Sequence, residues 1–78
     1  MTLKRAKNPM PDFVDAALKK EGLTGAYAAR PPYQRNDYLG WIARAKREAT
    51  KAKRLQQMLD ELAAGTAYMG MKWRGRGN

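Results

Sequence analysis

The sequence predicts an all-α fold, a small bundle of three to four helices with flexible basic termini. Two stretches carry apolar residues at the spacing of an amphipathic helix, and prolines and glycines separate the helical segments. The chain has 78 residues, which is one domain at most. We therefore divide it into a flexible basic leader at 1–10, a helical domain at 11–65 and a flexible basic Gly/Arg tail at 66–78.

The first predicted helix begins at Asp12 and ends at Glu21. Pro11 precedes it, acids occupy its first turn and lysines its last turn, which complements the helix dipole. Gly22 follows at the position where a helix-ending glycine is common. Its apolar residues are Phe13, Val14, Ala17 and Leu18.

A second, short helix of one or two turns is predicted within residues 23–29. It ends at Arg30-Pro31-Pro32, because the residue before a proline is pushed out of the α region. A third helix then begins near Pro32 or Tyr33.

Residues 33–64 carry two apolar stripes, and Gly65 ends the second. The stripes are Tyr38, Trp41, Ile42 and Ala45, and then Leu55, Met58, Leu59 and Leu62. At 100° per residue their centres lie about 80° apart around a common axis. We therefore expect two helices that meet at a break between Lys46 and Thr50. A single long helix stays open, because Glu48 and Ala49 are strong helix formers.

The residue types present exclude most catalytic and metal chemistry. The chain has no Cys and no His, so it forms no disulfide and lacks the usual ligands of transition metals. It also has no Ser, and its acids are scattered. We expect no enzyme, no catalytic residue, no cofactor and no metal. No apolar run approaches the roughly 18 residues of a membrane span, and no signal peptide is apparent. We therefore expect a cytoplasmic protein without a transmembrane segment.

The formal net charge is +9, and much of it lies between Arg44 and Arg54. One interpretation is a solvated face whose long basic side chains shield the apolar seam. The other is an anion-binding or partner-binding site at the start of the fourth helix, where free backbone N–H groups favour anions. Its candidate residues are Arg44, Lys46, Arg47, Thr50, Lys51 and Arg54. The sequence favours the solvated face.

The aromatic residues bear on the choice between a protein partner and nucleic acid. Trp41 is expected in the core; the alternative is a partly exposed binding platform. A nucleic-acid surface would place exposed aromatics among the basic residues, and none lies between Ala43 and Tyr68. The segment KWRGRGN at the end is read as a disordered basic terminus; the alternative is a segment that follows an RNA backbone.

Several short motifs follow one another in a defined order. They are Pro11-Asp12, Ala17-Leu18, Tyr27, Pro31-Pro32, Tyr38-Leu39, Trp41-Ile42, Ala45-Lys46, Thr50-Lys51 and Lys53-Arg54-Leu55. In this order and spacing the chain resembles the YdeI/OmpD-associated (bacteriocin-protection) family over residues 11–65. The resemblance implies an α-helical domain with no known enzymatic activity. The family name implies a link to bacteriocin tolerance or to outer-membrane porins.

The chain departs from the pattern of that family at a few positions. Tyr33 stands where the family usually has a Ser, and Arg30 where an apolar residue is common. Lys51 and Lys53 replace typical arginines, which weakens bidentate anion contacts.

From the resemblance we expect a non-enzymatic interaction module that acts through an unknown protein partner or as a homo-oligomer. The alternative is a non-specific nucleic-acid-binding protein that uses residues 44–54 and both basic ends.

Overall fold

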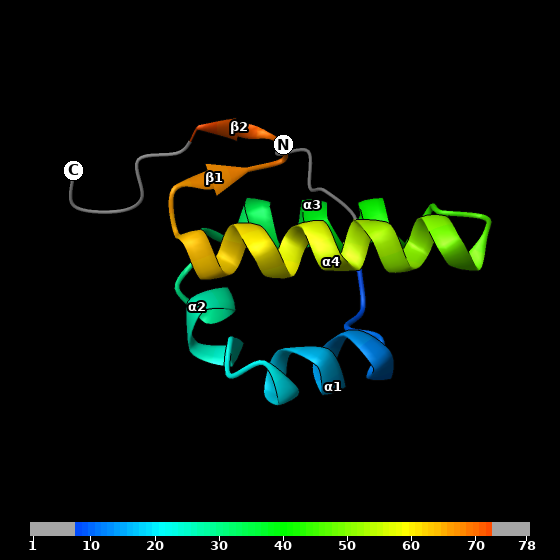
Figure 1. Cartoon of the computed structure of the whole chain (residues 1–78), viewed down its shortest axis with the longest axis horizontal. Coiled ribbons are helices and arrows are strands. Elements are labelled where there is room, and N and C mark those ends of the chain that lie inside the picture. Colours follow the sequence, from blue (N-terminus) through cyan, green and yellow to red (C-terminus); the bar gives the residue numbers. More distant parts are fainter. Residues whose placement is uncertain (1–7, 73–78) are drawn as a thin grey trace, which may run out of the picture.

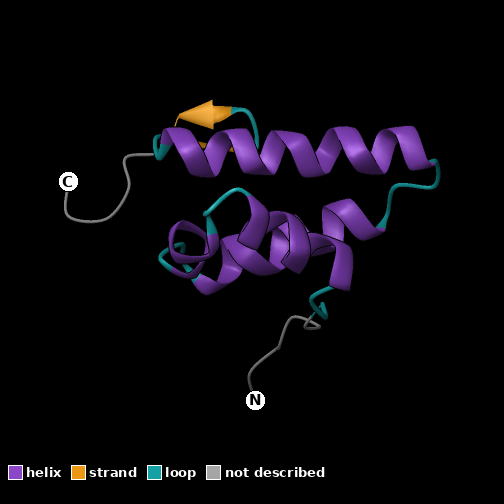
Figure 2. Ribbon diagram, turned by 60° about the horizontal axis from the view of Figure 1, so that its bottom comes forward, coloured by secondary structure: helices purple, strands orange, loops and turns teal. Residues whose placement is uncertain are grey.

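The computed structural model describes residues 8–72 and is mostly helical (Figure 1). Its elements are α1 (Asp12–Lys20), α2 (Thr24–Ala28), α3 (Pro32–Ala43), α4 (Glu48–Ala64), β1 (Ala67–Tyr68) and β2 (Met71–Lys72). In Figure 2, α4 runs along one side of the molecule and the other helices lie beneath it. None of the helices in this described part is long and apolar enough to cross a membrane.

The first helix begins and ends as its residues predict. The carbonyl oxygen of Pro11 accepts hydrogen bonds from the N–H groups of Val14 and Asp15, both at 3.1 Å. At the other end Gly22 adopts φ 69°, in the left-handed region that favours glycine. The N–H of Leu23 then donates to the carbonyl of Leu18 at 2.8 Å. This Schellman arrangement closes α1 and turns the chain toward α2.

The prediction of two helices within residues 33–64 is confirmed, but the break begins at residue 44, earlier than the predicted break between Lys46 and Thr50. α3 ends at Ala43 and α4 begins at Glu48, so residues 44–47 form the connection. The two helices run antiparallel, and the connection lies at one end of the molecule (Figure 1). The turn lets both apolar stripes face one core, which a single straight helix would not allow.

The core consists of residues from α1, α3 and α4. Its members are Val14, Leu18, Tyr38, Leu39, Ile42, Met58, Leu59 and Leu62. Trp41 and Leu55 are only half-buried and pack against this cluster. Phe13, although it shares the predicted apolar spacing of α1, is 43 % exposed.

The prediction of an all-α fold is wrong in one respect. Ala67–Tyr68 and Met71–Lys72 pair as an antiparallel hairpin, with Ala67 opposite Lys72 and Tyr68 opposite Met71. Met69 and Gly70 form the turn, with φ of 53° and 80°. Two consecutive residues with positive φ are typical of the type I′ turn of a tight hairpin. Strands of two residues are too short to show the alternation by which a strand is recognised in a sequence.

The chain before α1 makes specific contacts from Asn8 onward. The backbone N–H of Asn8 donates to Oδ1 of Asn36 at 2.7 Å. The side-chain amide of Asn8 donates to the backbone carbonyl of Asn36 at 3.0 Å. A Cβ on Gly40 would lie 2.8 Å from Nδ2 of Asn8, so a side chain at this position would displace the Asn8 amide. Of the expected flexible leader, residues 1–7 lie outside the described residues, as do residues 73–78 of the expected tail.

Candidate functional site

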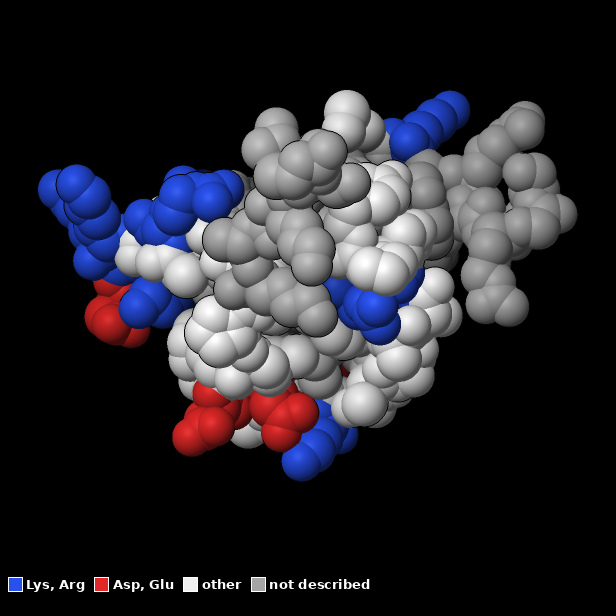
Figure 3. Space-filling view, turned by 180° about the vertical axis from the view of Figure 1, so that it is seen from behind, with Lys and Arg blue, Asp and Glu red and all other residues white. Residues whose placement is uncertain are grey.

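Basic side chains gather at the end of the molecule that holds the connection between α3 and α4 (Figure 3). Arg44, Lys46 and Arg47 lie in this connection and are exposed; we call them the basic corner. Thr50, Lys51 and Arg54 follow on α4 and are half-buried. The structure therefore divides the six predicted site residues into two groups.

Arg54 is held by α3. Its Nη1 donates to the backbone carbonyl of Trp41 at 2.7 Å, and its guanidinium lies 5.3 Å from the centre of the Trp41 ring. That carbonyl belongs to the last turn of α3, where the helix itself leaves acceptors without a partner. Arg54 thus closes the end of α3 and covers one face of the indole with a cation.

Replacing Arg54 with Ala should lower the free energy of unfolding by about 1–2 kcal/mol, because both the hydrogen bond and the ring contact are lost. Urea unfolding followed by circular dichroism measures the effect. Lys53→Ala is the matched control, since Lys53 is an exposed cation on the same helix and its loss should change stability by less than about 0.5 kcal/mol. Equal stabilities for the Arg54 and Lys53 variants would show that Arg54 is only a solvated charge.

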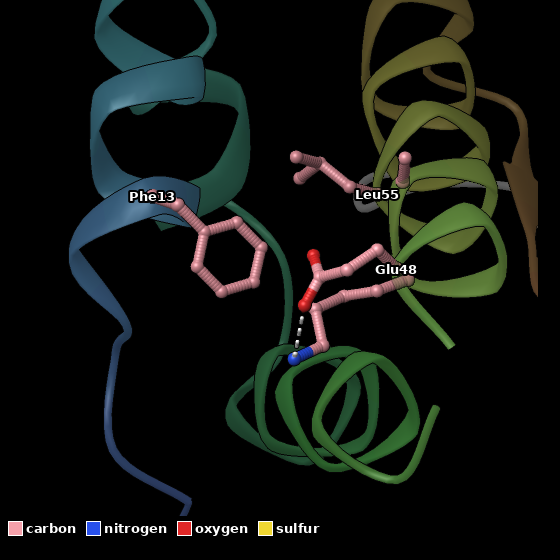
Figure 4. Close-up of a pocket in the computed structure, with 5 residues that line it drawn as sticks. Phe13, Glu48 and Leu55 are labelled. Carbon is pink, nitrogen blue, oxygen red and sulfur yellow. Dashed lines mark ion pairs between the residues drawn. The ribbon is translucent and has the colours of Figure 1, made fainter. Parts of the chain in front are cut away.

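Lys51 points toward α1 rather than toward the basic corner. Its Nζ lies 5.8 Å from the centre of the Phe13 ring and 4.0 Å from a carboxylate oxygen of Glu48. These side chains border a hollow of about 340 Å³ between α1 and α4, which we call the α1–α4 hollow (Figure 4). Its lining residues are Phe13, Glu48, Lys51, Ala52 and Leu55.

At the start of α4, Arg47 occupies the N-cap position and no side chain caps the helix, so no side chain occupies the N–H groups of its first turn. The side chain of Arg44 turns back along α3, where a Cβ on Gly40 would lie 3.1 Å from its Nη1. The predicted residues therefore do not converge on one point. They form an exposed basic corner beside two cations that hold the helices together.

A buried carboxylate that the sequence analysis did not single out joins α4 to the hairpin. Oε1 of Glu61 accepts hydrogen bonds from the hydroxyl of Tyr38 at 2.5 Å and from the N–H of Met69 at 2.8 Å. Oε2 accepts from the N–H of Gly70 at 2.7 Å and from the side-chain amide of Gln57 at 3.1 Å. The carboxylate therefore anchors the hairpin turn. Glu61 lies three residues after Met58 within the apolar stripe, and this spacing was the available signal.

The pKa values of Glu61 and Tyr38 reflect this hydrogen-bond network. Burial alone would raise the pKa of Glu61, but the hydrogen bonds from Tyr38, Gly70, Met69 and Gln57 outweigh it and hold the pKa below its usual range. Burial, followed by the hydrogen bond to Glu61, raises the pKa of Tyr38. At neutral pH the phenol of Tyr38 is therefore neutral and donates to the ionised carboxylate of Glu61. This arrangement serves the structure of the protein.

A second buried group lies where α2, α3 and α4 meet. Arg30 is 4 % exposed and Gln34 is fully buried. Nη1 of Arg30 donates to Oε1 of Gln34 at 3.1 Å, and Nη2 donates to the backbone carbonyl of Glu61 at 2.9 Å. Arg30 thus ties the start of α3 to α4. Within residues 8–72, no group of three or more His, Cys, Asp or Glu is placed to hold a metal ion.

Comparison with protein families gives a match. The model of a protein family described as "Bacteriocin-protection, YdeI or OmpD-Associated" matches residues 8–65. The matched range includes Asn8, which contacts α3, and ends at Gly65, so the hairpin lies outside it. No curated protein and no solved structure matches the chain.

Proposed function

The chain belongs to the bacteriocin-protection, YdeI or OmpD-associated family, and from this premise we propose that it is a non-enzymatic interaction module that binds an acidic surface of a partner protein. The observation that supports the proposal is the basic corner of Arg44, Lys46 and Arg47. Its three cations are exposed on the short connection between two packed helices, whereas Lys51 and Arg54 contact α1 and α3.

The net charge of the chain favours a different protein, rather than a second copy of the chain, as the binding partner. With a net charge of +9, two copies repel one another, and an acidic partner is attracted over a distance of several ångströms. A connection between packed helices also holds its residues in place, so less conformational entropy is lost when a partner binds.

The geometry of Trp41 weighs against nucleic acid as the partner. Base stacking needs an open aromatic face near the cations. The indole closest in sequence to the basic corner is half-buried and carries the guanidinium of Arg54 over its ring. An acidic protein surface needs no such face, because it pairs directly with the exposed cations.

Capture from nuclease-treated lysate tests the proposal with two triple variants. Arg44→Ser/Lys46→Ser/Arg47→Ser removes the basic corner, and Lys19→Ser/Lys20→Ser/Lys72→Ser removes three exposed cations elsewhere. We expect the same proteins to be enriched by the wild type and by the second variant, and to be lost with the first. Equal losses with both variants would reduce the binding to non-specific charge.

Two further results would contradict the proposal. One is a strict monomer in light scattering that enriches no protein from lysate. The other is micromolar binding of short DNA or RNA, falling steeply with salt, in the absence of protein capture. The second result would assign the basic corner to nucleic acid.

A further inference from the structure

Side chains of α3 and α4 hold the hairpin against the helices. The Tyr68 ring meets two rings of α3 edge to face, with its centre 6.0 Å from that of Tyr33 and 5.4 Å from that of Tyr38. Its hydroxyl donates to Oδ2 of Asp37 at 2.7 Å. The carboxylate of Glu61 accepts the next two backbone N–H groups, at 2.8 and 2.7 Å. We call Tyr33, Asp37, Tyr38 and Glu61 the turn-binding face.

The turn-binding face and the hairpin belong to different parts of the chain. All four residues of the face lie within residues 8–65, which the family model matches, and the hairpin follows that range. An isolated two-stranded hairpin is at best marginally stable in water, and these strands have two residues each. The hairpin therefore depends on the face for its shape, as a bound peptide does.

We infer that the turn-binding face recognises a tyrosine-bearing tight turn of a partner protein, and that residues 67–72 occupy it as an autoinhibitory contact. The contacts of the hairpin define the chemistry of that turn. An aromatic ring fits against Tyr33 and Tyr38, and a phenol hydroxyl reaches Asp37. Two successive residues with positive φ, commonly Asn-Gly, present their N–H groups to the carboxylate of Glu61.

The inference goes beyond the proposed function, because the turn-binding face lies far from the basic corner. The hairpin covers the end of α4 opposite to the connection with α3 (Figure 1). From Glu48 to Glu61 the helix rises about 20 Å, at 1.5 Å per residue over 13 residues, which exceeds the screening length of about 8 Å in physiological salt. A ligand of the face therefore does not depend on the basic corner.

A partner protein is a better occupant than the hairpin of a second copy. Two copies that exchanged hairpins would gain no contact beyond those that each chain already makes within itself. They would also bring together two chains with a net charge of +9 each. A turn of a different protein brings further contacts of its own and no such repulsion.

The hairpin can leave the face without stranding a buried polar group of the face. The carboxylates of Asp37 and Glu61 would exchange the hydrogen bonds of the hairpin for bonds to water, and the hydroxyl of Tyr38 would keep its bond to Glu61. Exposed residues 65 and 66 join the hairpin to α4. Such a tether gives the hairpin a high effective concentration, so a partner binds the closed chain more weakly than an open one.

The test compares the ¹⁵N-labelled wild type with the full-length open variant Tyr68→Ser/Gly70→Pro. The first substitution removes the ring, and the second breaks the turn, because Pro has no N–H and cannot adopt the φ of 80°. The probe is a synthetic hairpin peptide with the turn Tyr-Asn-Gly, whose sequence differs from that of residues 67–72. We expect amide shifts at the turn-binding face and an affinity about tenfold or more higher for the open variant.

The hydroxyl of the probe gives a matched control. A peptide with Phe in place of Tyr should bind the open variant about tenfold more weakly, because Asp37 then loses its donor. Adding Asp37→Ala should abolish this preference for Tyr. Asp60→Ala, at an exposed acid of α4, should preserve it. Met71→Ser in the wild type changes a side chain that is 60 % exposed but keeps the turn, so it should bind as the wild type does.

Circular dichroism verifies that every variant is folded. If the open variant is unfolded, titration of the wild type to high peptide concentration decides. The peptide should then displace the hairpin, so the amide signals of Met69 and Gly70 should move together with those of the turn-binding face.

Three results would overturn the recognition of a tyrosine-bearing turn. The first is the absence of shifts at the turn-binding face in either protein. The second is equal affinity of the wild type and the folded open variant. The third is equal affinity for peptides with Tyr or Ser before Asn-Gly. Wild-type dimers in light scattering that dissociate on addition of the peptide would assign the face to a second copy, and so overturn the assignment to a partner.

Lysate capture with the open variant tests the partner. We expect the open variant to enrich proteins that the wild type captures weakly, and the free peptide to displace them. If the open variant gains no protein, the inference fails, and capture that depends on the basic corner still supports the proposed function. If the gained proteins persist after the basic corner is removed and no other capture is lost, the proposed function fails instead.

Discussion

A Glu61→Gln variant should unfold at a clearly lower urea concentration than the wild type, with a loss of about 2–4 kcal/mol in the free energy of unfolding. The carboxylate accepts four hydrogen bonds, from Tyr38, Gln57, Met69 and Gly70. A Gln side chain has the same shape, but its NH₂ group replaces one of the two accepting oxygens. At least one buried donor then faces another donor, which costs more than the loss of a hydrogen bond.

Asp60→Asn is the matched control for this variant. Asp60 is the preceding residue, is exposed on α4 and accepts a hydrogen bond from Gln56 at 2.9 Å. Its neutralisation should change stability by less than about 0.5 kcal/mol. Amide hydrogen exchange adds a local measurement, since the N–H groups of Met69 and Gly70 should exchange faster only in Glu61→Gln. Equal stability and equal exchange in both variants would show that Glu61 does not anchor the hairpin.

The same network predicts how stability depends on pH. The folded protein lowers the pKa of Glu61 from its ordinary value of 4.5. The carboxylate therefore contributes its full stabilisation above the unfolded-state pKa, and this contribution is lost as the pH falls through the lower folded-state pKa. Urea titrations at a series of pH values should show the wild type approaching Glu61→Gln in acid. A difference between the two that stays constant from neutral pH down to acid would contradict this assignment.

The helices could be predicted because their signals are local. Pro11, Gly22 and Gly65 lie at the ends of helices, and the apolar spacing of α3 and α4 is visible within each segment. The hairpin could not be predicted in this way. Its turn is held by Glu61, eight and nine residues earlier, and Tyr68 donates to the carboxylate of Asp37 at 2.7 Å across 31 residues. Such contacts depend on the packing of α3 against α4.

The candidate site was predictable in composition but not in arrangement. Charge density alone identified residues 44–54. The separation of the exposed corner from Lys51 and Arg54 depends on Phe13 and Trp41, which reach these cations only after the helices have packed. Arg30 departs from the pattern of the family, but its partner could not be predicted from the sequence. The backbone carbonyl that accepts its hydrogen bond belongs to Glu61, 31 residues later in the chain.

Replacing Arg30 by Leu, an apolar residue, should lower the free energy of unfolding of this chain by about 2–3 kcal/mol. Arg30 and Gln34 are both buried, and Oε1 of Gln34 accepts from the guanidinium at 3.1 Å. Leu offers no donor, so this amide oxygen would be left buried without the partner it has in the folded protein. Urea unfolding measures the loss. Arg35→Leu is the control, since Arg35 is less buried and its hydrogen bond to the Ala28 carbonyl, at 3.3 Å, is exposed.

The double variant Arg30→Leu/Gln34→Leu separates a missing partner from a missing charge. Removing both polar groups leaves no unsatisfied amide, and apolar replacements of a buried polar pair are often nearly neutral. The hydroxyl of Tyr33, which accepts from the Gln34 amide at 3.2 Å, lies on an exposed residue and can bind water instead. We therefore expect the double variant to recover at least half of the stability lost by Arg30→Leu. If it is less stable than either single variant, Arg30 acts through its bond to the Glu61 carbonyl and not through Gln34.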